Sequence, residues 1–131
     1  MFSSLAQAEN YSDIWWNPAE SGWGINLTHQ ADTIFATWFT YGADGRGLWL
    51  VAPETTRRAT GEYRGRLYRT NGLSFDRIAG TPALLGAQDV GEITLTFADG
   101  ERGRLDYTVD GLTQSKALTR QVFGIGAPLC R

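Results

Sequence analysis

At 131 residues the chain has the length of one domain, and its 42% hydrophobic and 20% charged content is typical of a folded globular protein. A formal net charge of −2 argues against a nucleic-acid partner, because proteins that bind nucleic acids usually carry a basic excess. The longest apolar stretches, residues 33–41 and 48–53, are far shorter than the ~20 residues that a transmembrane helix needs, so we expect no membrane span.

Apolar and polar residues alternate along most of the chain, and turn residues interrupt the alternation at short intervals. A period of two is typical of half-buried β-strands, and no stretch shows the 3.6-residue period of an amphipathic helix. The predicted strands cover residues 21–30, 33–41, 48–55, 60–70, 90–97, 104–109 and 114–123, with a short additional first strand at 12–16. Residues 71–89 are less regular, and we expect a long loop there with a helical turn or an irregular strand around 73–78.

Short turns connect the predicted strands, and three of them contain the dipeptides Asp44-Gly45, Asp99-Gly100 and Asp110-Gly111. Asp-Gly supplies the positive φ angles that tight hairpins require. Sequential hairpins favour an up-and-down order, and about eight strands is the number that closes into a small barrel without exposed edges. We therefore predict an all-β fold, a single antiparallel up-and-down β-barrel of seven to eight strands, with a two-sheet β-sandwich as the alternative.

We expect the barrel domain to cover residues 11–123, between a leader (1–10) and a C-terminal tail (124–131). Residues 4–8, Ser-Leu-Ala-Gln-Ala, have the small-x-small ending of a secretory cleavage site, without the basic and apolar regions that should precede it. The leader is therefore either a signal-peptide remnant or an ordinary disordered polar segment. Cys130 is the single cysteine and cannot form an internal disulfide, so cysteine usage does not indicate the compartment.

The densest aromatic cluster is residues 13–25, which read Asp-Ile-Trp-Trp-Asn-Pro-Ala-Glu-Ser-Gly-Trp-Gly-Ile. It resembles a recurring segment, Trp-Trp-Asn-Pro-x-Glu-Ser-Gly-Trp-Gly, of uncharacterised exported bacterial β domains. The segments 35–41 and 107–121 are also similar to that family, so the resemblance covers most of residues 11–123. It implies a β architecture and a secreted or periplasmic location, and it supplies no activity or ligand.

Tryptophans in such a cluster can fill a barrel interior or bind a ligand. Because neighbouring residues on a strand point to opposite faces, Trp15 and Trp16 cannot both lie in the core unless the backbone bulges. The same reasoning applies to residues 35–41, which place aromatic side chains on both faces of one strand. Apolar groups on an outer face indicate a partner subunit, a neighbouring domain or a ligand.

Flat aromatic rings beside amide and carboxylate groups suit a sugar or another amphipathic molecule, since the ring stacks while the polar groups bind hydroxyls. We therefore predict a non-catalytic module that binds a carbohydrate or other small amphipathic ligand, without a cofactor. The predicted ligand-binding residues are Trp15, Trp16, Asn17, Glu20, Trp23, Asn26 and Trp38. One alternative is an assembly module that forms a homo-oligomer, or contacts a neighbouring domain, through residues 33–41. The other is a small glycan-cleaving enzyme.

Signs of catalysis are weak. His29 is the only histidine, and we interpret it as a solvent-facing residue beside a turn. With one histidine and one cysteine, a structural zinc site is not expected, and no phosphate-binding or dinucleotide-binding glycine motif occurs. Glycan cleavage would require two carboxyl groups about 5–9.5 Å apart. The candidates for that pair are Glu20, Glu54, Glu62 and Glu92.

Five arginines lie close together in the middle of the chain, at positions Arg57, Arg58, Arg64, Arg66 and Arg69. We interpret them as a solvated outer face paired with Glu54 and Glu62. Because guanidinium groups bind carboxylates and phosphates well, an anionic ligand such as an acidic polysaccharide is the alternative.

Overall fold

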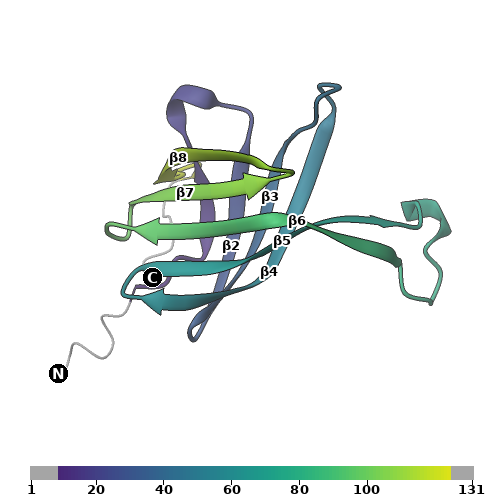
Figure 1. Cartoon of the computed structure of the whole chain (residues 1–131), viewed down its shortest axis with the longest axis horizontal. Coiled ribbons are helices and arrows are strands. Elements are labelled where there is room, and N and C mark those ends of the chain that lie inside the picture. Colours follow the sequence, from purple (N-terminus) through teal and green to yellow (C-terminus); the bar gives the residue numbers. More distant parts are fainter. Residues whose placement is uncertain (1–8, 125–131) are drawn as a thin grey trace.

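The computed structural model describes residues 9–124, and within them eight antiparallel strands form one closed barrel (Figure 1). Each strand pairs with the next one in the sequence, and β1 also pairs with β8, which closes the barrel. The strands are β1 (Asp13–Trp16), β2 (Gly24–Gln30), β3 (Thr33–Tyr41), β4 (Gly47–Ala59), β5 (Glu62–Gly72), β6 (Leu84–Phe97), β7 (Arg102–Val109) and β8 (Leu112–Arg120). The predicted up-and-down barrel is confirmed, and the chain does not form the alternative sandwich.

The structure contains all eight predicted strands, although several of their bounds differ from the prediction. β3 has the predicted bounds, and the short first strand is present as β1. β4 continues to Ala59 and β6 begins at Leu84, so both strands are longer than predicted. The sequence did not predict the start of β6 because residues 84–89 have no clear alternation, although all of them except Leu85 pair with β5.

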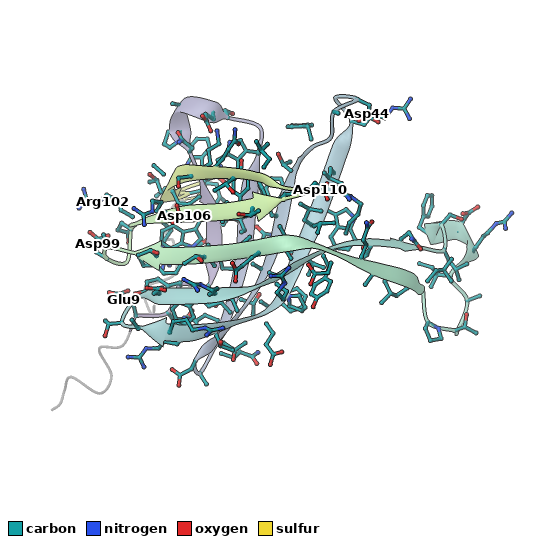
Figure 2. All side chains as sticks on the ribbon, viewed as in Figure 1. Glu9, Asp44, Asp99, Arg102, Asp106 and Asp110 are labelled. Carbon is teal, nitrogen blue, oxygen red and sulfur yellow. The ribbon has the colours of Figure 1, made fainter. Side chains whose placement is uncertain are left out.

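The up-and-down order separates the connections into two sets at opposite ends of the barrel. The β2–β3, β4–β5 and β6–β7 turns lie at one end, which we call the closed end. The β1–β2, β3–β4, β5–β6 and β7–β8 connections lie at the other, which we call the open end. Figure 2 shows this separation, with Asp99 and Arg102 at the β6–β7 turn and Asp110 and Asp44 on the opposite side of the molecule. Residues far apart in sequence therefore meet at each end.

The closed end is filled by aromatic side chains. The rings of Tyr11 and Phe97 stack with their centroids 3.8 Å apart, and Trp15 lies 5.0 Å from Phe97. His29 and Tyr63 complete the cluster, with ring centroids 5.2 Å apart. Above the closed end, the middle of the barrel is aliphatic, with fully buried side chains that include Ile25, Ile34, Leu50, Leu67, Ile93, Leu95, Leu105 and Leu118.

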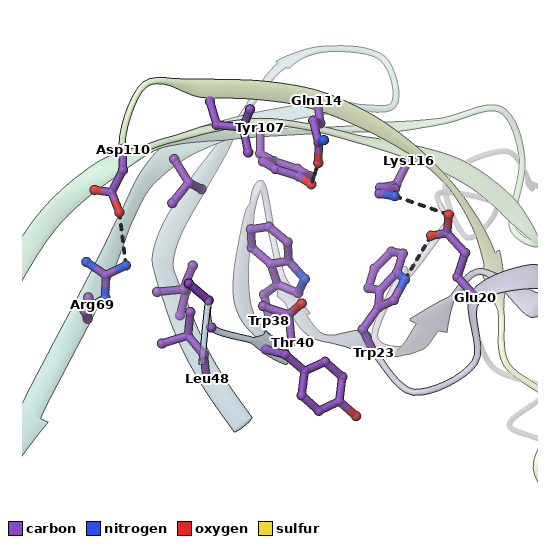
Figure 3. A pocket seen from close by; sticks show the side chains of 16 residues that line it. Glu20, Trp23, Trp38, Thr40, Leu48, Arg69, Tyr107, Asp110, Gln114 and Lys116 are labelled. Carbon is purple, nitrogen blue, oxygen red and sulfur yellow. Dashed lines mark hydrogen bonds and ion pairs between the residues drawn. The ribbon is translucent and has the colours of Figure 1, made fainter. Parts of the chain in front are cut away.

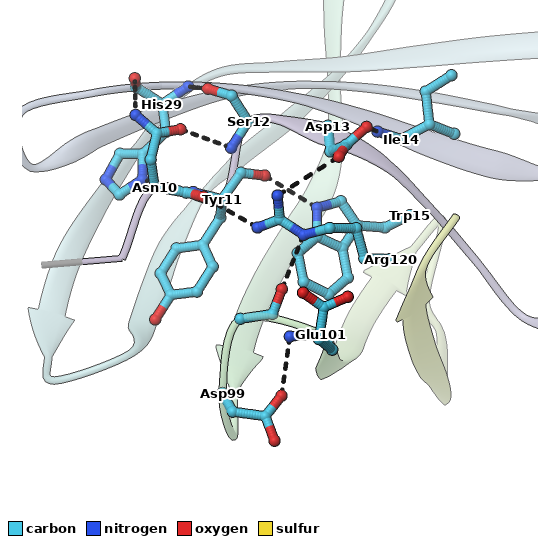
Figure 4. A network of polar contacts seen from close by, with 11 residues as sticks. Asn10, Tyr11, Ser12, Asp13, Ile14, Trp15, His29, Asp99, Glu101 and Arg120 are labelled. Carbon is cyan, nitrogen blue, oxygen red and sulfur yellow. Dashed lines mark hydrogen bonds and ion pairs between the residues drawn. The ribbon is translucent and has the colours of Figure 1, made fainter. Parts of the chain in front are cut away.

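The interpretation of His29 as a solvent-facing residue is wrong, because its side chain is buried in the closed end (Figure 4). His29 follows Ile25 and Leu27 at every second position of β2, so the alternation turns it inward. Its Nδ1 accepts a hydrogen bond from the Tyr11 backbone N–H at 3.1 Å, and its Nε2 lies 3.1 Å from the Tyr63 hydroxyl. Burial lowers the pKa of the imidazole.

The far part of the β5–β6 hairpin projects from the barrel as a two-stranded ribbon (Figure 1). The strands stay paired out to Gly72 and Leu84, and the connection contains the 3-10 helix η3 (Phe75–Arg77). The predicted helical turn around residues 73–78 is thus present, at the end of a hairpin that is longer than predicted. Among residues 9–124, no helix is long and apolar enough to cross a membrane.

Candidate functional site

A cavity of about 710 Å³ occupies the open end of the barrel (Figure 3). Side chains from the inward faces of β3, β4, β5, β7 and β8 form its wall, and the β1–β2 connection supplies one side of its rim. The aromatic and polar residues that line it include Glu20, Trp23, Trp38, Thr40, Tyr41, Arg69, Tyr107, Asp110, Gln114 and Lys116. The larger cavity is therefore at the open end, whereas the aromatic cluster of the closed end leaves a smaller one of about 230 Å³ beside Tyr11, His29 and Tyr63.

Aromatic rings form the floor and one wall of the cavity. Trp38 points inward from β3 and is only 6% exposed. Its ring lies 4.6 Å from that of Tyr107 on β7, with the two planes tilted by 52°. Trp23 stands at the rim, half-buried, just before β2 begins. Together the three rings offer apolar surfaces on which a flat ligand could pack.

A chain of polar contacts fixes the rim on the side of the β1–β2 connection (Figure 3). Trp23 Nε1 donates to Glu20 Oε1 at 3.0 Å, and Lys116 Nζ donates to Glu20 Oε2 at 3.2 Å. The hydrogen bond from Trp23, followed by the one from Lys116, lowers the pKa of Glu20, so this carboxylate is ionised at neutral pH. Glu20 therefore orients Trp23 and bridges two parts of the chain that are 96 residues apart.

The backbone of the β1–β2 connection places Glu20 at the rim. Asn17 precedes the 3-10 helix η2 (Pro18–Glu20), and its side-chain oxygen accepts a hydrogen bond from the Ala19 N–H at 2.9 Å. Pro18 begins the helical turn, where its missing N–H leaves no donor unsatisfied. Residues 17–20 thus form a 3-10 turn that Asn17 caps, and the last residue of this turn, Glu20, lines the cavity.

The opposite side of the cavity carries a second ion pair and a hydroxyl–amide pair. Arg69 Nη2 donates to Asp110 Oδ2 at 3.2 Å, and the Tyr107 hydroxyl donates to the Gln114 side-chain oxygen. Burial raises the pKa of Tyr107, so the phenol is neutral at ordinary pH. A ligand in the cavity would meet hydrogen-bonding groups on two sides and aromatic faces between them.

One polar group of the cavity wall has no partner. The indole Nε1–H of Trp38 is the only buried side-chain nitrogen or oxygen without a hydrogen bond within residues 9–124. In Figure 3 this edge of the indole is turned toward Trp23. Leaving a buried donor unsatisfied costs about 1–3 kcal/mol, so the group would gain from any acceptor that reached it.

The structure brings together three of the seven residues predicted to bind a ligand, namely Glu20, Trp23 and Trp38. The other four lie elsewhere. Trp15 is fully buried at the closed end, where its Nε1 donates to the Tyr11 carbonyl. Trp16 is half-buried on the other face of β1, so the two adjacent tryptophans diverge as predicted. Asn17 caps η2, and Asn26 is exposed on the outer face of β2.

Sequence reasoning missed the cavity residues of the C-terminal strands, Tyr107, Gln114 and Lys116. Gln114 and Lys116 alternate with outward residues and continue the inward face that Leu118 and Arg120 begin on β8. Polar residues on an inward face look like surface residues in a sequence, because a period of two does not say which face is buried. Once Leu118 is assigned to the core, the period of two places Gln114 and Lys116 on the same inward face. Without that assignment the sequence gives no signal for these residues.

The arginine run is mostly paired with carboxylates, although not always with the predicted ones. Arg64 pairs with Glu62 as predicted, at 3.7 Å. Arg66 forms a bidentate ion pair with Asp89, in which Nε and Nη2 donate to the two carboxylate oxygens at 3.0 and 2.7 Å. The predicted pairing with Glu54 is wrong, because none of the described arginines lies within 4.0 Å of its carboxylate. Glu54 lies in the part of β4 between Val51 and Thr56, where the pairing with β5 shifts register.

The geometry offers little for acid–base chemistry at the cavity. Of the four candidate glutamates only Glu20 lines it, and the other carboxylate there, Asp110, is held by Arg69 on the opposite side (Figure 3). A general acid needs a raised pKa, whereas that of Glu20 is lowered. His29 belongs to the closed end. Within the described part of the chain, no three His, Cys, Asp or Glu side chains gather as metal ligands would.

Comparison with known proteins gives no match: no family model, no curated protein and no solved structure is similar to this chain.

Proposed function

We propose that the domain is a non-catalytic binding module whose open end holds a carbohydrate or another small amphipathic ligand. The observation that carries the proposal is the cavity of about 710 Å³, which combines the faces of Trp23, Trp38 and Tyr107 with paired polar groups. Ligand sites are typically concave and mostly apolar, have volumes of roughly 300–1,000 Å³ and contain a few fixed polar groups. A small barrel can also enclose one ligand at its mouth.

The polar groups favour a ligand that carries hydroxyl groups. The carboxylate of Glu20 and the amide of Gln114 can accept hydrogen bonds from hydroxyls, and Lys116 can donate to them. Trp38 Nε1–H adds a donor that no protein group satisfies. Rotation of a neighbouring side chain would let a ligand acceptor reach it, and such rotamer changes are common on binding.

The proposal is tested by calorimetric titration of the purified protein against mono- and disaccharides and small amphipathic aromatic compounds. The informative variant is Trp38→Phe, which keeps an aromatic ring in the wall and removes the N–H donor. We expect it to lose about 1 kcal/mol of binding free energy, or roughly fivefold in Kd. Trp23→Ala should weaken binding more, because it removes a whole ring from the rim.

Trp16→Phe is the matched control, since it makes the same change at a half-buried tryptophan that does not line the cavity. It should leave the Kd unchanged. No binding by any compound of the panel, or equal losses in Trp38→Phe and Trp16→Phe, would refute the proposal.

The resemblance of residues 15–24 to exported β domains supports a location outside the cytoplasm, which we include in the proposal. Fractionation of cells that express the natural gene, with the protein detected by antibody, tests this part separately. Recovery in the cytoplasmic fraction alone would contradict it.

A further inference from the structure

A strip of exposed aromatic side chains runs along the outer wall of the barrel. Phe35, Phe39 and Tyr41 point outward from β3 and are 45%, 40% and 55% exposed, and Trp49 of β4 is 54% exposed. From Phe35 to Tyr41 the strip is about 20 Å long, given ~3.3 Å per strand residue. We call these four residues the outer strip. None of them is needed to fill the core, which lies on the other face of both strands.

The backbone holds the rings of the outer strip in fixed places. Phe39 and Trp49 are direct cross-strand partners, and Phe39 also lies beside Gly24 of β2. A Cβ atom at Gly24 would come within 2.7 Å of the Phe39 ring, so the glycine lets the ring lie flat across the neighbouring strand. The Tyr41 hydroxyl donates to the Gly22 carbonyl at 2.7 Å, which ties this ring to the β1–β2 connection.

The outer strip is continuous with the cavity. A shallow groove of about 290 Å³ lies between Phe39, Tyr41 and Trp49, and its other walls come from Thr40 and Leu48. Thr40, Tyr41 and Leu48 also line the cavity, so the groove and the cavity meet at this part of the rim. No charged side chain lines the groove, in contrast to the two ion pairs of the cavity.

The size of the strip argues against a second protein chain as its occupant. Four aromatic side chains, each about half exposed, offer roughly 400 Å² in all, from the 150–250 Å² that one such residue can bury. A stable protein interface buries about 800 Å² on each partner. The strip is also narrow, because the exposed neighbours Asn26 and Thr28 on β2 are polar. A chain-like ligand one ring wide matches these dimensions better than a protein surface.

We infer that the outer strip is a second subsite for a neutral, linear oligosaccharide that leaves the cavity over the rim at Tyr41. The sugar rings beyond the rim stack on Trp49 and Phe39, and the absence of charge in the groove selects an uncharged chain. This inference rests on the proposed function, because the cavity holds one end of the same ligand. It predicts that affinity increases with the length of the oligosaccharide.

The test compares short and long members of three neutral series in calorimetric titrations: cellobiose with cellohexaose, chitobiose with chitohexaose, and maltose with maltohexaose. In the series that binds, the hexasaccharide should bind about tenfold more tightly than the disaccharide, as expected for one or two added stacking contacts. Trp49→Ala should remove this gain and leave the disaccharide Kd unchanged. Trp38→Phe should weaken both ligands by the same factor.

Phe75→Ala is the control, because Phe75 is an aromatic residue with 90% exposure, in η3, that lines neither the cavity nor the groove. It should change neither Kd. Disaccharide and hexasaccharide of equal affinity, or a length effect that survives in Trp49→Ala, would overturn the inference and leave the proposed function standing. The inference would also be overturned if only non-carbohydrate compounds bound, or if sedimentation showed a dimer that the Trp49→Ala substitution dissociates. Absence of binding across the whole panel would overturn both.

Discussion

Replacing Arg120 by methionine should destabilise the barrel more than any comparable change at its surface. The Arg120 side chain is 2% exposed at the closed end and joins β8 to the residues before β1 (Figure 4). Its Nε donates to the Gly100 carbonyl at 2.7 Å and its Nη2 to the Asn10 carbonyl at 2.9 Å. Its Nη1 lies 3.4 Å from the Asp13 carboxylate, and its guanidinium stacks 4.9 Å from the centre of a Trp15 ring.

Methionine conserves most of the volume, so the loss comes from the polar groups left behind. The two carbonyls lose charge-assisted hydrogen bonds of about 1.5–3 kcal/mol each. Asp13, whose side chain is 9% exposed, becomes a buried charge without its cation. Removing one partner of a buried ion pair typically costs 3–5 kcal/mol, and because the contributions overlap we expect a total of about that size rather than their sum.

Urea denaturation followed by far-UV circular dichroism measures the change in the free energy of unfolding. The matched control is Arg104→Met, since Arg104 also forms an ion pair, at 2.8 Å from Asp106, with its side chain 61% exposed. Exposed pairs contribute about 0–1 kcal/mol, so this variant should remain near the parent protein. A loss below 1 kcal/mol in Arg120→Met, or equal losses in both variants, would contradict the reasoning.

Two further predictions concern the closed end and the β6–β7 hairpin. His29 is held neutral, because its Nδ1 accepts from the Tyr11 N–H and burial lowers its pKa. The unfolded chain therefore binds a proton more readily, so stability is complete above the unfolded pKa of about 6.5 and falls as the pH drops below it. His29→Gln should show a smaller loss of stability between pH 7.5 and 5.0 in urea titrations, and an identical loss would contradict this. Gly91 has φ +155°, and a Cβ there would lie 1.7 Å from the Thr108 carbonyl oxygen, so Gly91→Ala should lower stability by about 3 kcal/mol or more. Gly45 has φ +78° and nothing within 4 Å of an added Cβ, so Gly45→Ala should lower the free energy of unfolding by only about 1–2 kcal/mol in thermal denaturation. Equal losses of stability in Gly91→Ala and Gly45→Ala would refute the predicted clash at Gly91.

The local pattern of the sequence was sufficient for the fold and for part of the candidate site. The β-branched and aromatic residues of 33–41 predicted β3 with aromatic side chains on both of its faces. The divergence of Trp15 and Trp16 followed from the geometry of an extended strand. The Asp-Gly turns indicated hairpins, and hairpins in series indicated an up-and-down order. The motif at residues 15–24 drew attention to Glu20 and Trp23, which line the cavity. These are all relations between residues close together in the chain.

The tertiary structure decided which faces enclose a core and which distant residues meet. Only barrel closure brings Lys116 to Glu20, 96 residues away, and Arg120 to the Asn10 carbonyl, 110 residues away. It also buries His29 and turns Gln114 inward, although both look like surface residues in the sequence. Strand alternation is set by backbone geometry within a few residues, so a sequence displays it directly. Contacts between strands far apart in the chain depend on register and closure, which the whole barrel determines together.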